Sequence, residues 1–145
     1  MHAAFCDWTK KVNHENSVSI HIRRGDCVQI SCTVDEEYYY HAIEMVQKRI
    51  PNAKFYVFTD DKVYAGKLMD NTNARYEIVD YVKQNSTLED FYLMRSCSHH
   101  FVANSSYSWW AAYLCNWDAC IIAPLTGIWK DDFYPNDWEK IKVGE

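Results

Sequence analysis

The chain has 145 residues, of which 48% are apolar and 24% charged, an ordinary composition for one globular domain that argues against disorder. Its net charge of −5 argues against broad contact with a nucleic-acid backbone. No stretch approaches the roughly 18 consecutive apolar residues of a membrane span, and the N-terminus lacks the basic start and apolar run of a secretory signal. The sequence therefore predicts a cytoplasmic protein, with peripheral binding to the inner face of the membrane left open.

The cysteines do not form a recognisable framework. The chain has 6 cysteines and 6 histidines, with no C-x-x-C pair and no metal-ligand spacing between the two residue types. Several of the cysteines lie in apolar runs, where a reduced thiol behaves as a small hydrophobic group. We therefore expect free thiols in a reducing compartment and no bound metal.

The hydrophobic period alternates between the values typical of strands and helices. Residues 17–22 alternate with period two, and from Asp35 a helical spacing follows, which Pro51 ends. The same reasoning predicts strands over 55–59, 75–79, 100–103 and 119–123, and helices over 62–69, 86–97 and 108–115. Strands separated by helices pair in parallel through right-handed crossovers. The predicted fold is thus α/β, a Rossmann-like parallel sheet flanked by helices, formed by residues 17–145 after a leader or linker remnant over 1–16.

Three polar clusters each follow a predicted strand directly. They are His21-Ile22-Arg23-Arg24-Gly25-Asp26, Thr59-Asp60-Asp61 and Asn104-Ser105-Ser106-Tyr107-Ser108. Because parallel strands end at the same edge of a sheet, the clusters should meet in one crevice, where open α/β sheets bind ligands.

The first cluster suits an anionic ligand. An Arg at a strand end can hold two phosphate oxygens, and since neighbouring side chains point to opposite sides, only one of Arg23 and Arg24 should face the crevice. The other could pair with Asp26, and a plain surface ion pair is the structural alternative. His21 could bond to a base or ribose, or be a satisfied core histidine. An adhesion role for the Arg-Gly-Asp tripeptide is discounted for a cytoplasmic chain.

The other two clusters leave alternatives open. Asp60 and Asp61 could form a metal site, recognise a base or cap a helix, and no third oxygen ligand for a metal lies at a defined spacing. The third cluster offers hydroxyl and backbone N–H groups at a helix start, which suits an anion, although Ser106 could simply cap the helix.

Two aromatic pairs receive structural interpretations. Trp109 and Trp110 are expected to pack their helix against the sheet. His99 and His100, at a strand start, are expected at a solvated edge, because adjacent strand residues face opposite ways.

The run Val18-Ser19-Ile20-His21-Ile22-Arg23-Arg24-Gly25-Asp26 resembles the H-x-R-R-G-D-Y motif of the α-1,2-fucosyltransferases, glycosyltransferase family 11. The resemblance continues through the following segments: 35–39, 49–53, 55–61, 103–114, 122–124 and Trp129. Within it, Ala103 to Leu114 is similar to the family's A-N-S-[ST]-[FY]-S-W-W-[GA]-A block. The matched region covers about residues 15–143, nearly the whole chain.

The resemblance implies the C-terminal, donor-binding domain of a GT-B-like enzyme that transfers fucose from GDP-fucose to the 2-hydroxyl of a β-galactoside, with inversion and without a metal or other cofactor. Arg23 would hold the β-phosphate, with Arg24 beside it, while His21 and Asp60 or Asp61 would read guanine or ribose. Ser105, Ser106 and Ser108 would line the diphosphate, and Asn104 would also belong to the GDP-fucose site. Arg23 and Asp26 are the catalytic candidates, although pairing with Arg24 would favour a structural role for Asp26.

Two departures from the family pattern bear on activity. Cys27 stands where the family has Tyr, and the family's N-terminal G-G-L-G-N-Q-M-F-Q-Y-A-like segment, which helps form the acceptor cleft, has no counterpart here. We therefore expect a donor domain that could be inactive alone, with the missing domain as its partner. The alternatives are a non-catalytic guanine-nucleotide or nucleotide-sugar-binding module and an interaction protein with an exposed apolar patch.

Overall fold

A computed structural model of the chain describes residues 3–22, 36–81, 86–103, 106–115, 119–125 and 131–142. The elements, in chain order, are α1 (Ala3–Val12), β1 (Ser17–Ile22), α2 (Glu36–Arg49), β2 (Lys54–Thr59), α3 (Lys62–Asp70), β3 (Arg75–Ile78), α4 (Ser86–Ser96), β4 (His99–Phe101), α5 (Ser106–Tyr113), β5 (Ile121–Leu125), the 3-10 turn η2 (Asp131–Phe133) and β6 (Glu139–Lys142).

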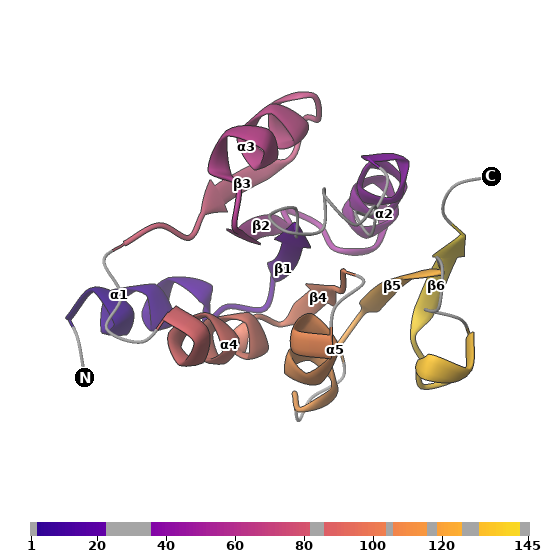
Figure 1. The fold of residues 1–145 in the computed structure, drawn as a ribbon. Helices are drawn as coiled ribbons and strands as arrows, with labels where there is room; N and C mark the ends of the chain where they lie inside the picture. The colour runs from indigo at the N-terminus through magenta and orange to yellow at the C-terminus, as the bar shows by residue number, and fades with distance from the viewer. Residues whose placement is uncertain are drawn as a thin grey trace.

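The strands form one six-stranded sheet in the order β3-β2-β1-β4-β5-β6. Every pairing between neighbours is parallel. Helices α2 and α3 lie on one side of this sheet, and α1, α4 and α5 lie on the other (Figure 1). This arrangement confirms the predicted Rossmann-like α/β fold.

Period-two alternation in β1 separates two chemically different faces. Val18, Ile20 and Ile22 point to the face covered by α2 and α3, where each is at most 1% exposed. Ser17, Ser19 and His21, one residue out of phase, must point to the opposite face. Both serines are hydrogen-bonded: the Ser17 hydroxyl donates to the nearby His14 carbonyl at 2.8 Å, and Ser19 Oγ lies 3.0 Å from Nδ1 of His100 on β4.

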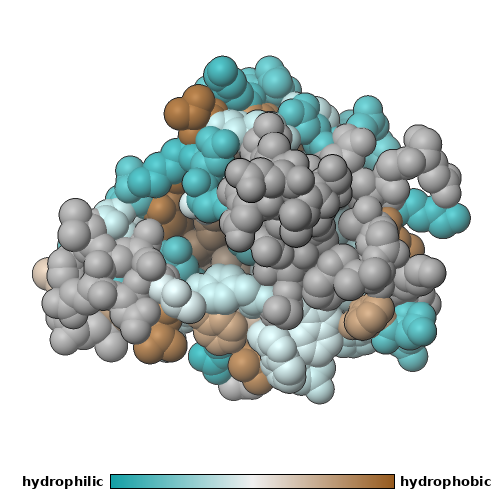
Figure 2. Space-filling model, viewed as in Figure 1, coloured by the Kyte–Doolittle hydropathy of each residue, from teal (hydrophilic) through white to brown (hydrophobic). Residues whose placement is uncertain are grey.

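The layer of α2 and α3 is apolar within and hydrophilic outside (Figure 2). Its buried tyrosines also anchor the sheet. The Tyr38 hydroxyl donates to the carbonyl oxygens of Val102 and Ile122 at 2.7 and 2.9 Å, and the Tyr39 hydroxyl donates to that of His21 at 3.0 Å. Helix α2 thus bonds to carbonyl groups of β1, of β5 and of the residue that follows β4, which ties the helix to the sheet.

Helix α1 lies before the first predicted element, in a segment for which the sequence indicated no helix. Its residues Phe5, Trp8 and Val12 are buried against Tyr56 and Phe58 of β2 and against α4. This spacing of three and four residues is the amphipathic pattern of a helix with one buried side. The first helix therefore contributes to the same core as the sheet.

The last strand, β6, was also missed by sequence reasoning. Its neighbour, β5, contains a proline, Pro124, which is unusual inside a sheet. In parallel strands alternate residues bond to opposite neighbours, and Val102 N–H donates to the Ile122 carbonyl, so Pro124 also faces the β4 side. Strand β4 ends at Phe101, so the absent N–H of Pro124 costs no ladder bond there. Strand β6, Glu-Lys-Ile-Lys, is short and charged, as edge strands commonly are.

Two sequence interpretations are wrong. His100 is 1% exposed and bonded to Ser19, so it is a core residue and not part of a solvated edge. Trp110 is 49% exposed and does not pack on the sheet, whereas Trp109 packs on Trp138 with ring centroids 5.6 Å apart. Among the described cysteines, Cys6, Cys97, Cys115 and Cys120 are free thiols, as expected; Cys27 and Cys32 lie outside the described residues.

Candidate functional site

The sheet order places a ligand crevice between β1 and β4. The chain runs outward from β1 through β2 to β3 and then continues on the other side of β1 with β4. The crossover helices therefore leave β1 and β4 on opposite sides of the sheet, which opens a crevice at their carboxyl ends. Ile22 is level with Thr59 in the β1–β2 register, so the first two predicted clusters do begin side by side.

The predicted site residues are only partly described. Arg23, Arg24 and Asp26 fall within 23–35, outside the described residues, as do Asn104 and Ser105. Ser106 is the first residue of α5, but its side chain is not described either. His21, Asp60, Asp61 and Ser108 can be placed individually.

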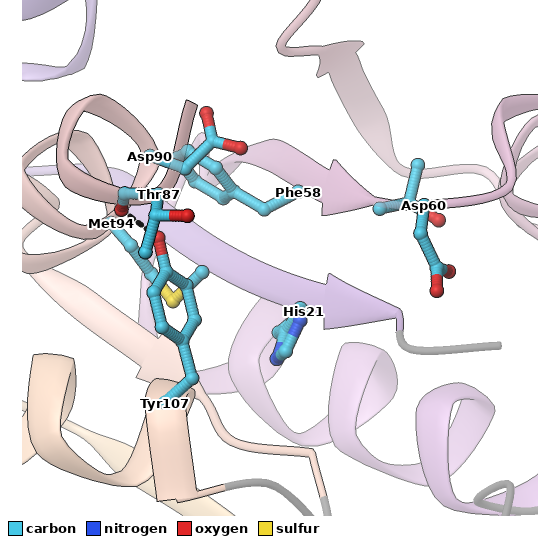
Figure 3. A pocket seen from close by; sticks show the side chains of 8 residues that line it. His21, Phe58, Asp60, Thr87, Asp90, Met94 and Tyr107 are labelled. Carbon is cyan, nitrogen blue, oxygen red and sulfur yellow. Dashed lines mark hydrogen bonds between the residues drawn. The ribbon is translucent and has the colours of Figure 1, made fainter. Parts of the chain in front are cut away.

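A cavity of about 200 Å³ lies at this edge of the sheet (Figure 3). Its walls come from the ends of β1 and β2, one side of α4 and the start of α5: His21, Phe58, Thr59, Asp60, Thr87, Asp90, Met94 and Tyr107. Pockets for whole drug-sized ligands span roughly 300–1,000 Å³, so this cavity suits one ring system of a larger ligand.

His21 forms the floor of the cavity at the end of β1. Its ring centroid lies 6.0 Å from that of Tyr107, at an interplanar angle of 56°. Its Nδ1 atom is shielded from solvent, and its carbonyl is held by Tyr39 of α2. His21 is therefore fixed by contacts from both sides of the sheet.

Tyr107 joins the starts of α4 and α5. Its hydroxyl donates to the Thr87 carbonyl, and its ring meets Phe91 edge-on at 5.5 Å. Burial, with the nearby Asp90 carboxylate as a second cause, raises the pKa of Tyr107 well above its usual value. The phenol is consequently neutral and acts as a hydrogen-bond donor, not as a base.

The structure separates the two adjacent aspartates. Asp61 caps α3: its Oδ1 accepts from the Tyr64 N–H at 3.1 Å, and its own N–H donates to Thr59 Oγ1 at 3.0 Å. Asp60 lines the cavity instead, apart from the His21 and Tyr107 group (Figure 3). The capping alternative thus describes Asp61, and Asp60 is the better placed for a ligand.

Ser108 braces the start of α5 against β4. Its hydroxyl is buried and accepts from the Ala103 N–H at 3.1 Å, immediately beyond the strand. This bond satisfies the Ala103 N–H, which lies beyond the end of β4, and it fixes the position of the first turn of α5 relative to that strand. Contact of Ser108 with a diphosphate remains a prediction.

The α4 contribution was missed by sequence reasoning. Thr87, Asp90 and Met94 are spaced by three and four residues, so they share one face of α4. That periodicity is visible in the sequence, but it does not say which helix or strand the face meets. Its position over β1 follows from the switch of α4 to the opposite side of the sheet.

No group of three or more metal-ligating side chains occurs within the part of the chain that the structure describes. The described helices also include none that is long and apolar enough to cross a membrane. A reaction without metal or cofactor, implied by the resemblance, stays a prediction.

Comparison with known proteins decides the family. The sequence model of glycosyl transferase family 11 matches residues 6–142, from within α1 to the last residue of β6. The chain belongs to glycosyltransferase family 11. This membership confirms the resemblance carried by the strand-end motifs and identifies the chain with a family of glycosyltransferases.

Relatives within the family are bacterial and mammalian. The chain is 35% identical over 139 residues to an alpha-1,2-colitosyltransferase of Escherichia coli, covering 88% of this chain and 48% of the relative. It is 31% identical to the O-antigen biosynthesis glycosyltransferase WbnK of Escherichia coli, over 79% of this chain and 41% of that protein. It is 25% identical to the galactoside 2-alpha-L-fucosyltransferase SEC1 of Bos taurus, over 75% and 31% respectively. The chain therefore spans half or less of the length of these curated relatives.

Proposed function

We propose that this chain binds the donor of an α-1,2-glycosyltransferase, a GDP-linked fucose or colitose, for inverting transfer to the 2-hydroxyl of a galactoside. The observation that carries the proposal is the cavity at the sheet's switch point, lined by both polar and apolar side chains, inside a chain that family 11 matches almost throughout. The sugars are those that the names of its relatives print.

The cavity has the chemistry to hold a purine base. Tyr107, which is partly exposed, offers aromatic surface for stacking, which is worth roughly 1–3 kcal/mol per base. The Asp90 carboxylate can accept hydrogen bonds from the ring N–H and the exocyclic amino group of guanine. Uracil has no exocyclic amino group, so this carboxylate favours guanine over uracil. Asp60, which also lines the cavity, would accept a hydrogen bond from a ribose hydroxyl.

The diphosphate would lie between the end of β1 and the start of α5. Arg23 directly follows β1 in the sequence, and we assign its guanidinium to the β-phosphate; the backbone N–H groups at the start of α5 would supply a second set of donors. Negative charge builds up on the GDP as the sugar leaves, and donors fixed in advance stabilise that charge. Arg24 and Asp26 would hold the same segment in place.

The proposal is tested by calorimetric titration of the 145-residue chain with GDP, GDP-fucose and UDP. We expect guanine nucleotides to bind and UDP to bind much more weakly. Arg23→Ala should abolish binding of GDP, and Asp90→Asn should weaken it about tenfold, the equivalent of roughly 1.4 kcal/mol. Asp137→Asn, at an exposed aspartate outside the cavity, is the matched control. A folded chain that binds no guanine nucleotide would refute the proposal.

A second candidate is a nucleotide-sugar-binding module without catalysis, which the same cavity would serve equally well. Both candidates predict binding of GDP. Transfer of labelled fucose to a β-galactoside by the purified chain, lost in Arg23→Ala, would exclude the module.

A further inference from the structure

A cluster of exposed apolar side chains covers the outer side of α5. We call it the aromatic patch: Trp110 and Tyr113 of α5, Leu114 directly after the helix, and Phe133 of η2, exposed by 49%, 52%, 42% and 52%. In the view of Figure 2 the surface over α5 is pale, in contrast to the hydrophilic outer surface of α2 and α3. Exposed apolar side chains gathered at one place on the surface often mark an interaction site.

Trp109 holds the rings of the aromatic patch in place by contacting Trp110, Tyr113 and the backbone of Phe133. Trp109 stacks on Tyr113 with ring centroids 4.9 Å apart and an interplanar angle of 13°. The Trp109 indole N–H donates to the Phe133 carbonyl at 2.8 Å, which ties η2 to α5. Trp110 meets both Trp109 and Tyr113 edge-on, at 4.9 and 5.7 Å. A ligand therefore meets a preorganised surface, and little side-chain entropy is lost on binding.

We propose that the aromatic patch binds an uncharged glycan chain, the non-reacting sugars of the acceptor. Helix α5, Ser-Tyr-Ser-Trp-Trp-Ala-Ala-Tyr, has no charged residue, and the charges at the margin of the patch have both signs, Arg95 at the Leu114 carbonyl and Asp132 beside Phe133, which matches a neutral ligand. The C–H groups on one side of a pyranose carry a small positive charge and meet the negative face of an aromatic ring favourably. Rigid, half-exposed indole and phenol rings thus suit sugar rings laid flat upon them.

The patch is small for a protein partner and has the wrong charge for a membrane. Aromatic side chains offer about 150–250 Å² each when fully exposed, so these half-exposed side chains present on the order of 400 Å². A stable protein interface buries about 800 Å² per partner. Helices that bind membrane surfaces carry Lys and Arg on their polar face, and α5 carries neither.

Continuity with the cavity supports a role for the patch in the reaction. Tyr107, in the first turn of α5, lines the cavity, and Tyr113 is its last residue. At 1.5 Å per residue these positions are separated by about 9 Å along the helix axis, about the length of two sugar rings. A glycan on the patch would extend toward the donor site, so the inference rests on the proposed function.

The test measures binding of lacto-N-tetraose, a neutral tetrasaccharide that ends in galactose, by saturation-transfer NMR and tryptophan fluorescence up to about 10 mM. The wild-type chain should bind saturably, and Trp110→Ala should weaken binding at least about tenfold. Val63→Ala, which shortens an exposed apolar side chain on α3, should bind as the wild type does. GDP is titrated into the same samples, and its binding should be the same in all three proteins.

Each contrary outcome has a distinct signature. Samples that bind GDP but no tetrasaccharide, or that bind it equally well after Trp110→Ala, overturn the inference while the proposed function stands. Samples that bind no GDP refute the proposed function, whether or not they bind the tetrasaccharide. Trp110-dependent self-association in sedimentation would instead assign the patch to a second copy of the chain. Trp110-dependent binding to phosphatidylethanolamine–phosphatidylglycerol vesicles would assign it to a membrane.

Discussion

The two faces of the sheet differ in chemistry: one packs against an apolar core, and the other carries polar side chains and the cavity. On the face covered by α2 and α3, β1 presents Val18, Ile20 and Ile22 to a continuous apolar core. On the other face the same strand presents Ser17, Ser19 and His21, and the cavity lies there. The first face is built for burial, whereas the second accepts polar groups in the interior and must satisfy each of them with a partner. Substitutions at adjacent residues of one strand should therefore have opposite consequences.

The largest effect is expected on the apolar face. Ile20 is completely buried, so Ile20→Ala removes buried methyl groups and leaves a cavity, lowering the free energy of unfolding by about 2–5 kcal/mol. Urea unfolding followed by circular dichroism measures this change. A loss below about 1 kcal/mol would mean that this face is loosely packed.

The polar face should make the protein sensitive to acid. Burial, with His99 as a second cause, lowers the pKa of His100 to about 3 from its usual 6.5. Below pH 6.5 the His100 imidazole therefore binds a proton in the unfolded chain but not in the folded chain. The free energy of unfolding consequently falls as the pH drops from 6.5 toward 3. Between pH 6.5 and 5 the loss approaches about 2 kcal/mol, at 1.36 kcal/mol per pH unit.

Urea unfolding at several pH values, on the wild type and on His100→Gln, isolates this effect. Gln cannot titrate, so the variant should be less sensitive to pH over this interval even if its stability at pH 7 is lower. Parallel curves for the two proteins would show that His100 does not titrate as described.

A smaller loss of stability is expected where the tyrosine hydroxyls of α2 bond to carbonyl groups of the sheet. Tyr38→Phe removes the hydroxyl that donates to the Val102 and Ile122 carbonyls while keeping the ring. The lost bond should cost about 1–2 kcal/mol of unfolding free energy. Tyr39→Phe is the matched comparison, because the Tyr39 hydroxyl donates to one carbonyl. Equal losses from the two variants would contradict a dual role for the Tyr38 hydroxyl.

The smallest effect on stability, with the clearest effect on binding, is expected at the cavity. His21→Ala, at a partly exposed position, should change the free energy of unfolding by less than about 1 kcal/mol but weaken GDP binding several-fold. Ile22→Ala, one residue further on the other face, should destabilise the fold and leave GDP affinity unchanged in the folded fraction. Calorimetry combined with urea unfolding separates the two outcomes, and a reversal would mean that the faces do not divide stability from binding.

The sequence alone determined the repeating order of strands and helices from residue 17 to 125, because period-two and helical spacings are local properties of the chain. It also located the strand-end motifs, since parallel strands end at one edge. It missed α1 and β6: no element was assigned to residues 1–16, and Glu-Lys-Ile-Lys is short and charged.

Only the tertiary structure decided what each side chain meets. Local spacing placed Thr87, Asp90 and Met94 on one face of α4, but the passage of α4 to the opposite side of the sheet brought that face to His21. It buried His100 beside Ser19, although the sequence placed both on ordinary strands 81 residues apart. It also left Trp110 exposed, because the buried side of α5 is taken by Ser108, Ala111 and Ala112. Contacts between distant segments depend on how elements cross the sheet, and no local pattern encodes that.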